Sequence, residues 1–130
     1  MTNKEIVQRA LAELLTTGST EGLRPLLSEG FVHHRPDASS TRDEWLAAVE
    51  AALTPLAGME VEIGHLLADG EHVVLHTRRR IPDGPEIAVV DIWRIDDGLL
   101  AEAWEIIEPL AQAQTNLTWW APTPTPAPAR

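Results

Sequence analysis

The sequence contains no cysteine among its 130 residues. This absence excludes disulfides, thiolate catalysis and zinc sites built on cysteine. No apolar run approaches the ~20 residues that a transmembrane helix needs. Residues 1–5 also lack the charged-then-apolar pattern of a secretory signal. We therefore expect a cytoplasmic protein.

Basic residues are also scarce. Ten lysines and arginines stand against 20 aspartates and glutamates, which gives a net charge of −10. Nucleic-acid binding needs a basic field to contact phosphates, and an anionic membrane surface repels an acidic protein. We therefore expect neither a nucleic acid nor a membrane as a partner.

The residues that are present fit one soluble domain. Hydrophobic residues make up 44% and charged residues 23% of the chain, which is ordinary for a globular protein. The length allows a single core. Four of the ten prolines fall in the last ten residues. This composition predicts a domain over residues 1–120 and a flexible, polyproline-like tail over residues 121–130.

Helical signals fill the first half of the chain. Thr2 with Glu5, and Thr41 with Glu44, have the spacing of a capping box, and an apolar stripe of helical period follows each pair. These patterns predict two amphipathic helices. The segment 20–29 carries three leucines and predicts a third, shorter helix between them.

After Gly58 the apolar period changes from 3.6 to 2, which is typical of strands. Turn signals at 69–70, 82–85 and 96–98 divide the rest into four strands. Helices followed by an antiparallel meander predict an α+β fold, with the helices covering one face of the sheet.

The turn lengths predict a register. Loops of two, four and three residues at these turns place His76 opposite Asp91, and Val89 opposite Glu105. Directly opposed residues share a face. The face that we expect to form a pocket then carries Met59, Val61, Ile63, Val74, His76, Arg78, Val89, Asp91, Trp93, Glu105 and Ile107. Arg79 is expected on the other face, beside Glu60.

An apolar wall with a few ionisable groups is typical of a small-molecule pocket. An imidazole beside a carboxylate is oriented in one tautomer and transfers protons near neutral pH. A carboxylate against Trp93 is expected to have a raised pKa. We therefore predict Asp91 as the general base, with His76 and Glu105 as further catalytic residues.

These residues also allow structural interpretations. Asp91 can instead pair with Arg78 or Arg80, Glu105 can pair with Arg78, and His76 can be a hydrogen-bonded wall residue. No histidine spacing supports a metal site, so none is predicted. His33 and His34 follow each other in the chain and are also compatible with an exposed loop.

Residues 91–107 (DIWRIDDGLLAEAWEII) resemble the closing hairpin of the SnoaL-like polyketide cyclases, within the NTF2-like superfamily. The family pattern there runs roughly Asp-Ile-Phe-Arg-x-x-x-Gly-Lys-Ile-x-Glu-His-Trp-Asp. Residues 31–36 (FVHHRP) resemble its aromatic-x-x-His-x-Pro segment, and residues 73–76 (VVLH) resemble its central strand. The resemblance spans about residues 4–110.

The resemblance implies a cone-shaped α+β barrel around a deep pocket, formed by N-terminal helices on a curved antiparallel sheet. It also implies a homodimer without a cofactor. Members abstract protons with a pocket aspartate or histidine. Asp91 matches that aspartate, and His34 and His76 match pocket histidines. The family's histidine in Glu-His-Trp-Asp is Ala103 here, and its aspartate is Glu105.

We therefore expect a cofactor-independent enzyme that cyclises, isomerises or dehydrates a hydrophobic oxygenated molecule, such as a polyketide or terpenoid intermediate. The alternative is a non-catalytic small-molecule-binding or dimeric assembly protein on the same scaffold. The alanine at position 103, where the family pattern has a histidine, favours the non-catalytic alternative. Asp91, which matches the family's aspartate, favours the enzyme. The residues expected to bind the substrate are His34, Trp93, Arg78, Ile63, Val89 and Phe31.

Overall fold

The computed structural model describes residues 1–16 and 18–120, without the side chains of Trp119 and Trp120. The expected proline-rich tail, 121–130, lies outside these residues. The described part is an α+β fold, as predicted. Its elements are α1 (Asn3–Thr16), the 3-10 helix η1 (Arg24–Leu26), β1 (Leu27–Arg35), β2 (Ala38–Thr41), α2 (Arg42–Leu53), β3 (Glu60–Asp69), β4 (His72–Arg80), β5 (Glu86–Asp96), β6 (Leu99–Pro109), the 3-10 helix η2 (Leu110–Gln112) and α3 (Ala113–Trp120).

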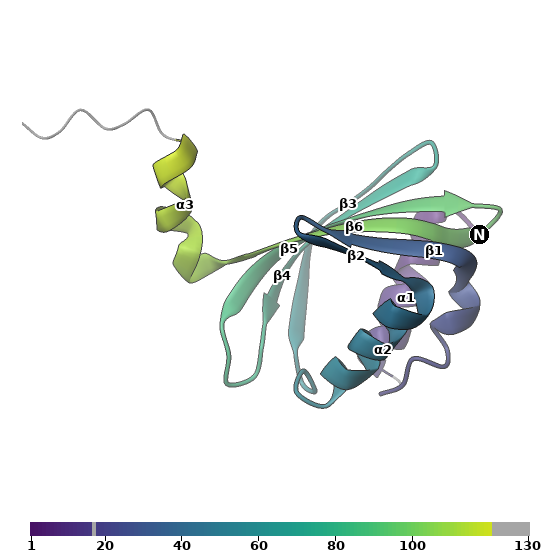
Figure 1. The fold of residues 1–130 in the computed structure, drawn as a ribbon, viewed down its shortest axis with the longest axis horizontal. Helices are drawn as coiled ribbons and strands as arrows, with labels where there is room; N and C mark the ends of the chain where they lie inside the picture. The colour runs from purple at the N-terminus through teal and green to yellow at the C-terminus, as the bar shows by residue number, and fades with distance from the viewer. Residues whose placement is uncertain (17, 121–130) are drawn as a thin grey trace, which may run out of the picture.

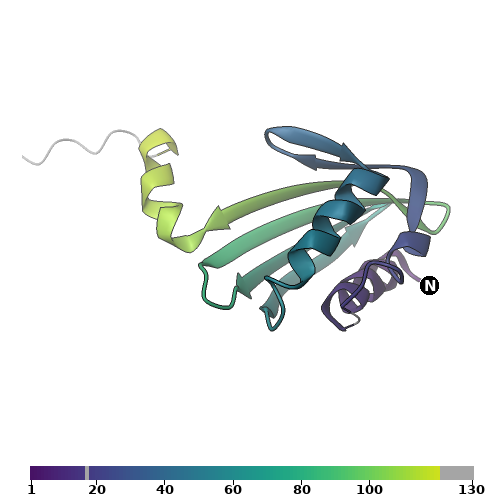
Figure 2. The ribbon, with the colours of Figure 1, turned by 60° about the horizontal axis from the view of Figure 1, so that its bottom comes forward.

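The strands form one six-stranded sheet in the order β2-β1-β6-β5-β4-β3. The predicted meander of β3 to β6 is confirmed. The expected antiparallel sheet is nevertheless mixed, because β1 pairs in parallel with β6. The sheet does not close into a barrel, since β2 and β3 remain at its two edges. Figures 1 and 2 show α1 and α2 against one face of the curved sheet, and α3 projecting beyond the end of β6.

Both predicted capping boxes are present. The backbone N–H of Glu5 donates to Thr2 Oγ1 at 3.2 Å, and that of Thr2 donates to Glu5 Oε1 at 3.0 Å. At α2 the backbone N–H of Glu44 donates to Thr41 Oγ1 at 3.3 Å, and that of Thr41 donates to Glu44 Oε1 at 2.9 Å. Each pair satisfies two N–H groups that the first helical turn leaves without partners.

The helix predicted over residues 20–29 is wrong. Only Arg24–Leu26 are helical there, as one 3-10 turn, and β1 begins at Leu27. Pro25 lacks the N–H that the interior of an α-helix needs. The strand conformation also buries Leu27 and Phe31, which are 3% and 1% exposed. The burial of these two side chains beside β6 outweighs the local helical pattern.

The predicted register between β4 and β5 is wrong by one residue. Arg80 pairs with Glu86, so the loop between the strands has five residues, 81–85, and not four. A shift of one residue turns every side chain of a strand to the other face. Leu75 therefore lies opposite Asp91, and the next residue, His76, points to the convex face.

Between β5 and β6, an irregularity after Arg94 changes the register once more. Such a bulge adds a residue to one strand and shifts the pairs that follow. The loop between β5 and β6 also differs from the prediction, since Asp96 pairs with Leu99 and the loop has two residues and not three. The shorter loop and the irregularity each shift the register by one residue, and together they place Glu105 directly opposite Asp91 instead of opposite Val89. A shift of two residues leaves the face unchanged, so Asp91 and Glu105 share the concave face, as predicted.

The core lies between this concave face and the helices α1 and α2. Phe31, Trp45 and Trp93 form its aromatic centre, with ring centroids 5.3 to 6.4 Å apart. Leu23, Val73 and Leu100 are 0% exposed. No helix among the described residues is long and apolar enough to cross a membrane.

The observed register is testable on two leucines of neighbouring strands. Leu75 is 2% exposed and Leu67 is 58% exposed. We expect Leu75→Ala to lower the free energy of unfolding by about 2–5 kcal/mol, because it opens a cavity in the core. Leu67→Ala should change it by about 0.5 kcal/mol or less. Urea denaturation of both variants measures the difference, and equal losses would contradict the register.

Candidate active site

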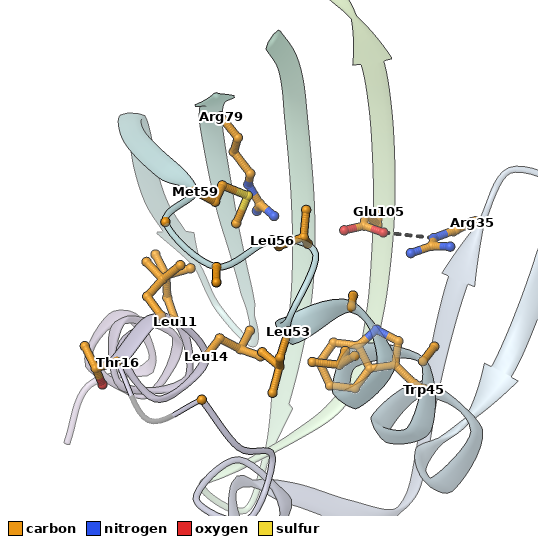
Figure 3. A pocket seen from close by; sticks show the side chains of 17 residues that line it. Leu11, Leu14, Thr16, Arg35, Trp45, Leu53, Leu56, Met59, Arg79 and Glu105 are labelled. Atoms are coloured by element: carbon orange, nitrogen blue, oxygen red, sulfur yellow. Dashed lines mark hydrogen bonds and ion pairs between the residues drawn. The ribbon is translucent and has the colours of Figure 1, made fainter. Parts of the chain in front are cut away.

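A cavity of about 520 Å³ lies between α1, α2, the connection after α2 and the concave face of the sheet. Figure 3 shows its side chains. Most of the lining is apolar, which is typical of a site for a small organic molecule. The lining residues are Leu11, Leu14, Leu15, Thr16, Gly18, Arg35, Trp45, Ala48, Val49, Ala52, Leu53, Leu56, Ala57, Gly58, Met59, Arg79 and Glu105.

The helices supply the apolar walls because their hydrophobic residues recur with helical period. Trp45, Val49 and Leu53 are four residues apart and therefore lie on the same side of α2. Leu11 and Leu14 face them from α1. Neither helix contributes a charged side chain to the lining.

Three charged side chains from the sheet form one end of the cavity, which we call the polar end. They are Arg35 on β1, Arg79 on β4 and Glu105 on β6. Figure 3 shows Arg79 and Glu105 pointing from the sheet into the cavity. Arg35 Nε donates to Glu105 Oε1 at 2.9 Å. The Glu105 side chain is 12% exposed, whereas that of Arg35 is 53% exposed.

Asp91 lies behind the polar end and is not itself among the lining residues. It is 4% exposed and directly opposite Glu105 across the β5–β6 ladder. Arg79 Nη2 donates to Asp91 Oδ2 at 2.9 Å, and Arg79 Nε donates to Thr77 Oγ1 at 3.0 Å. Arg79 therefore links the buried carboxylate to the cavity.

The environment of Asp91 changes its acidity. Burial raises the pKa of Asp91 to about 7, because the ionised carboxylate loses its hydration. The Arg79 guanidinium opposes this rise in the pKa, and the nearby Glu105 carboxylate adds to it. Asp91 therefore exchanges a proton near neutral pH, where an acid–base catalyst is most effective.

His33 is a buried neighbour of this group, although the sequence was compatible with an exposed loop there. It is 3% exposed and stacks on Trp45 with 5.2 Å between ring centroids. Its Nε2 lies 3.9 Å from Glu105 Oε1. Burial lowers the pKa of His33, so the imidazole is neutral at pH 7. Ala103, where the resemblance leads us to expect a histidine, pairs with His33 across β1 and β6.

Two predicted site residues on β4 lie on the convex face instead. His76 pairs with Val90, and its Nδ1 is 3.0 Å from Nδ1 of His65. The Arg78 side chain is 56% exposed and forms an ion pair with Glu86. The expected contact between His76 and Asp91 is therefore wrong. The cause is the five-residue loop, which turns Arg79 and not Arg78 toward the cavity.

His34 is also on the convex side of the sheet. Its Nδ1 is 2.7 Å from Ser39 Oγ, and its Nε2 is 2.6 Å from Glu102 Oε2. Its ring stacks on Trp104 at 5.4 Å. Because neighbouring residues of a strand face opposite sides, the burial of His33 in the core turns His34 away from the cavity.

The remaining predicted substrate-binding residues do not line the cavity. Phe31, Val89 and Trp93 are on the concave face, but they are buried in the core and do not reach the cavity, with exposed fractions of 1%, 1% and 6%. Ile63 is 48% exposed on the edge strand β3. Of the predicted site residues, only Glu105 lines the cavity and Asp91 adjoins it through Arg79.

Sequence reasoning missed Arg79, Arg35 and the helical walls. The apolar stripes on the two helices identify the face that packs on the sheet, and extending the pocket to that face would have found the walls. Arg79 has no such signal. One face of β4 carries Val73 and Leu75 before Arg79, and the other carries Val74 and His76 before Arg78, so alternation alone does not choose between the two arginines.

Among the described residues, no group of three or more histidine, aspartate or glutamate side chains is arranged to hold a metal ion. The chemistry of the site rests on Arg35, Arg79 and Glu105 at the polar end and on Asp91 behind it. These groups are able to bind an oxygen-bearing ligand and to move a proton.

Comparisons with known proteins agree with this architecture. The family model of the SnoaL-like domain matches residues 7–103. A comparison with curated proteins finds no match.

Several solved structures share the fold at low identity. IdmH of Streptomyces antibioticus, a candidate polyketide cyclase, is 20% identical with a TM-score of 0.72, and the match covers 88% of this chain and 99% of that one. An LEH-like epoxide hydrolase of M. tuberculosis is 15% identical with a TM-score of 0.69, covering 88% and 96%. A candidate ketosteroid isomerase of Kribbella flavida is 18% identical with a TM-score of 0.68, covering 82% and 77%.

The raised pKa of Asp91 has a consequence for stability. Its folded-state pKa of about 7 is above the ordinary value of 3.8, so the unfolded chain releases this proton at lower pH than the folded protein does. The contribution of Asp91 to stability is then fully present below pH 4 and is lost as the pH rises toward 7.

We expect the free energy of unfolding of the wild type, relative to Asp91→Asn, to fall by about 4 kcal/mol between about pH 4 and pH 7 and to stay level above that. Using the difference between the two proteins cancels the pH dependence of the groups that do not interact with Asp91. Urea denaturation at several pH values measures it. A difference that is constant with pH would contradict the raised pKa.

Proposed function

We propose a function on the premise that this chain belongs to the SnoaL-like domain family, whose model matches most of it. The chain is a cofactor-independent enzyme that transfers protons on a hydrophobic oxygenated small molecule. Its reaction begins with proton abstraction next to a carbonyl group and leads to cyclisation, isomerisation or dehydration. Polyketide-like or terpenoid compounds are the substrate class.

The observation that carries this proposal is the position of Glu105. Its carboxylate faces an apolar cavity, directly opposite the buried carboxylate of Asp91. Arg35 holds Oε1, while Oε2 has no hydrogen-bond partner among the described residues. Oε2 is thus oriented and available to take a proton from a bound molecule. Glu105, rather than Asp91, is the general base, because Asp91 does not line the cavity.

Asp91 is a positioning residue in this proposal. It holds Arg79 and lies beside Glu105, so its charge influences both. The largely apolar walls from α1 and α2, which carry no charged side chain, support a hydrophobic substrate. The relatives named as a cyclase, an isomerase and an epoxide hydrolase support proton transfer as the common type of chemistry.

Proton abstraction is testable without knowledge of the natural substrate. Incubation of enolisable ketones, such as 2-tetralone, in deuterated water reports abstraction as deuterium uptake in the mass spectrum. We expect Glu105→Gln to slow this exchange about a hundredfold or more, because it removes the base. The affinity for the ketone, measured by thermal stabilisation, should not change.

Glu102→Gln is the matched control. Glu102 is on the same strand but on the convex face, where it contacts His34. It should exchange deuterium at the wild-type rate. If ketones bind and stabilise the protein but no exchange exceeds that in buffer, the enzymatic proposal is wrong and the chain is a binding protein.

A further inference from the structure

The guanidinium of Arg79 is held in a fixed orientation by hydrogen bonds that use two of its three nitrogens. Nε donates to Thr77, which is 0% exposed, and Nη2 donates to Asp91. Nη1 has no hydrogen-bond partner within the described part of the chain. Two hydrogen bonds fix the plane of a guanidinium. The cavity therefore contains a pre-organised cationic donor, which loses little conformational freedom when a ligand binds.

This orientation is specific to Arg79 among the three consecutive arginines of β4. Arg78 and Arg80 are 56% and 68% exposed and form ion pairs with Glu86 and Glu60 outside the cavity. The Arg79 side chain is only 16% exposed. A hydrogen bond between such a shielded cation and an anion is stronger than one in water.

We propose that the cavity binds apolar carboxylic acids, and that the ligand's carboxylate replaces Asp91 as the charged partner of Arg79. This inference rests on the proposed function and names the substrate class of the same site. The apolar body of the acid lies between α1 and α2, and its carboxylate lies against Nη1 of Arg79 at the polar end.

The charges around Arg79 show why a bound carboxylate has to replace Asp91 as the charged partner of Arg79. Asp91 is influenced by Arg79 from β4, by Glu105 from β6 and by Arg35 from β1. His33 of β1 lies beside Glu105, with 3.9 Å between Nε2 and Oε1. With His33 neutral, an added carboxylate gives three negative charges against two arginines.

Protonation of Asp91 restores the balance at two against two. Burial already raises the pKa of Asp91 to about 7, so the carboxyl takes up a proton at little cost near neutral pH. A ligand anion nearby favours the neutral form further. Binding of the acid is therefore coupled to the uptake of one proton by Asp91.

Calorimetric titration of the whole chain with 2-naphthoic acid and its neutral isostere 2-naphthamide tests the inference. We expect the acid to bind about tenfold or more tightly than the amide at pH 6, because only the acid forms a charged hydrogen bond with Arg79. Above about pH 7, the affinity for the acid should fall about tenfold per pH unit, while that for the amide stays constant. Buffers of different ionisation enthalpy should report the uptake of one proton at pH 8.

Two substitutions separate the roles of Arg79 and Asp91. Arg79→Met should weaken binding of the acid about tenfold or more and leave the amide unaffected, whereas Arg78→Met, the matched control, should change neither. Asp91→Asn is always neutral at this position. It should remove the pH dependence and bind the acid about tenfold more tightly than the wild type at pH 8, with similar affinity at pH 6.

Equal affinity for acid and amide, the absence of proton uptake at pH 8, or weaker binding of the acid by Asp91→Asn would each overturn the inference. If Arg79→Met does not fold, the last two measurements still decide it. Neither requires turnover. Normal binding of the acid without Glu105-dependent deuterium exchange contradicts the proposed function alone, and exchange without preference for the acid contradicts this inference alone.

Discussion

The buried ion pair between Arg79 and Asp91 is the interaction on which the candidate site depends. A carboxylate and a guanidinium lose their hydration when they are buried, and the attraction between them offsets only part of that cost. The remaining cost appears in the raised pKa of Asp91. The protein thus holds, at and behind the polar end of the cavity, a charged pair of Arg79 and Asp91. Its net charge changes when Asp91 takes up a proton, and a bound anion favours that uptake.

Asp91 and Glu105 lie on the same face of the sheet, but their surroundings differ and give the two carboxylates different roles. Asp91 is enclosed by the sheet and contacts Arg79, whereas Glu105 reaches the cavity and contacts the half-exposed Arg35. Each carboxylate therefore has its own arginine. The helices add apolar walls and no charge, so the electrostatics of the cavity come from the sheet alone.

Family membership accounts for the fold of this chain, and the side chains of the site distinguish it from other proteins with that fold. The fold is shared with proteins that differ in name from cyclase to epoxide hydrolase at 15–20% identity. A fold of this kind supplies a cavity, and the side chains at its polar end decide the reaction. Here Ala103 stands where the resemblance leads us to expect a histidine, and a different histidine, His33, lies beside it on the neighbouring strand.

The sequence by itself determined the elements whose signals are local. The capping boxes at Thr2 and Thr41 and the turns of the meander needed no distant contact to be recognised. The fold class and the presence of Asp91 and Glu105 on the concave face followed from them. Only the tertiary structure decided which residues join these carboxylates. The loop 81–85 is one residue longer than predicted, and side chains alternate along a strand. Leu75 and Arg79 therefore point to the concave face in place of His76 and Arg78.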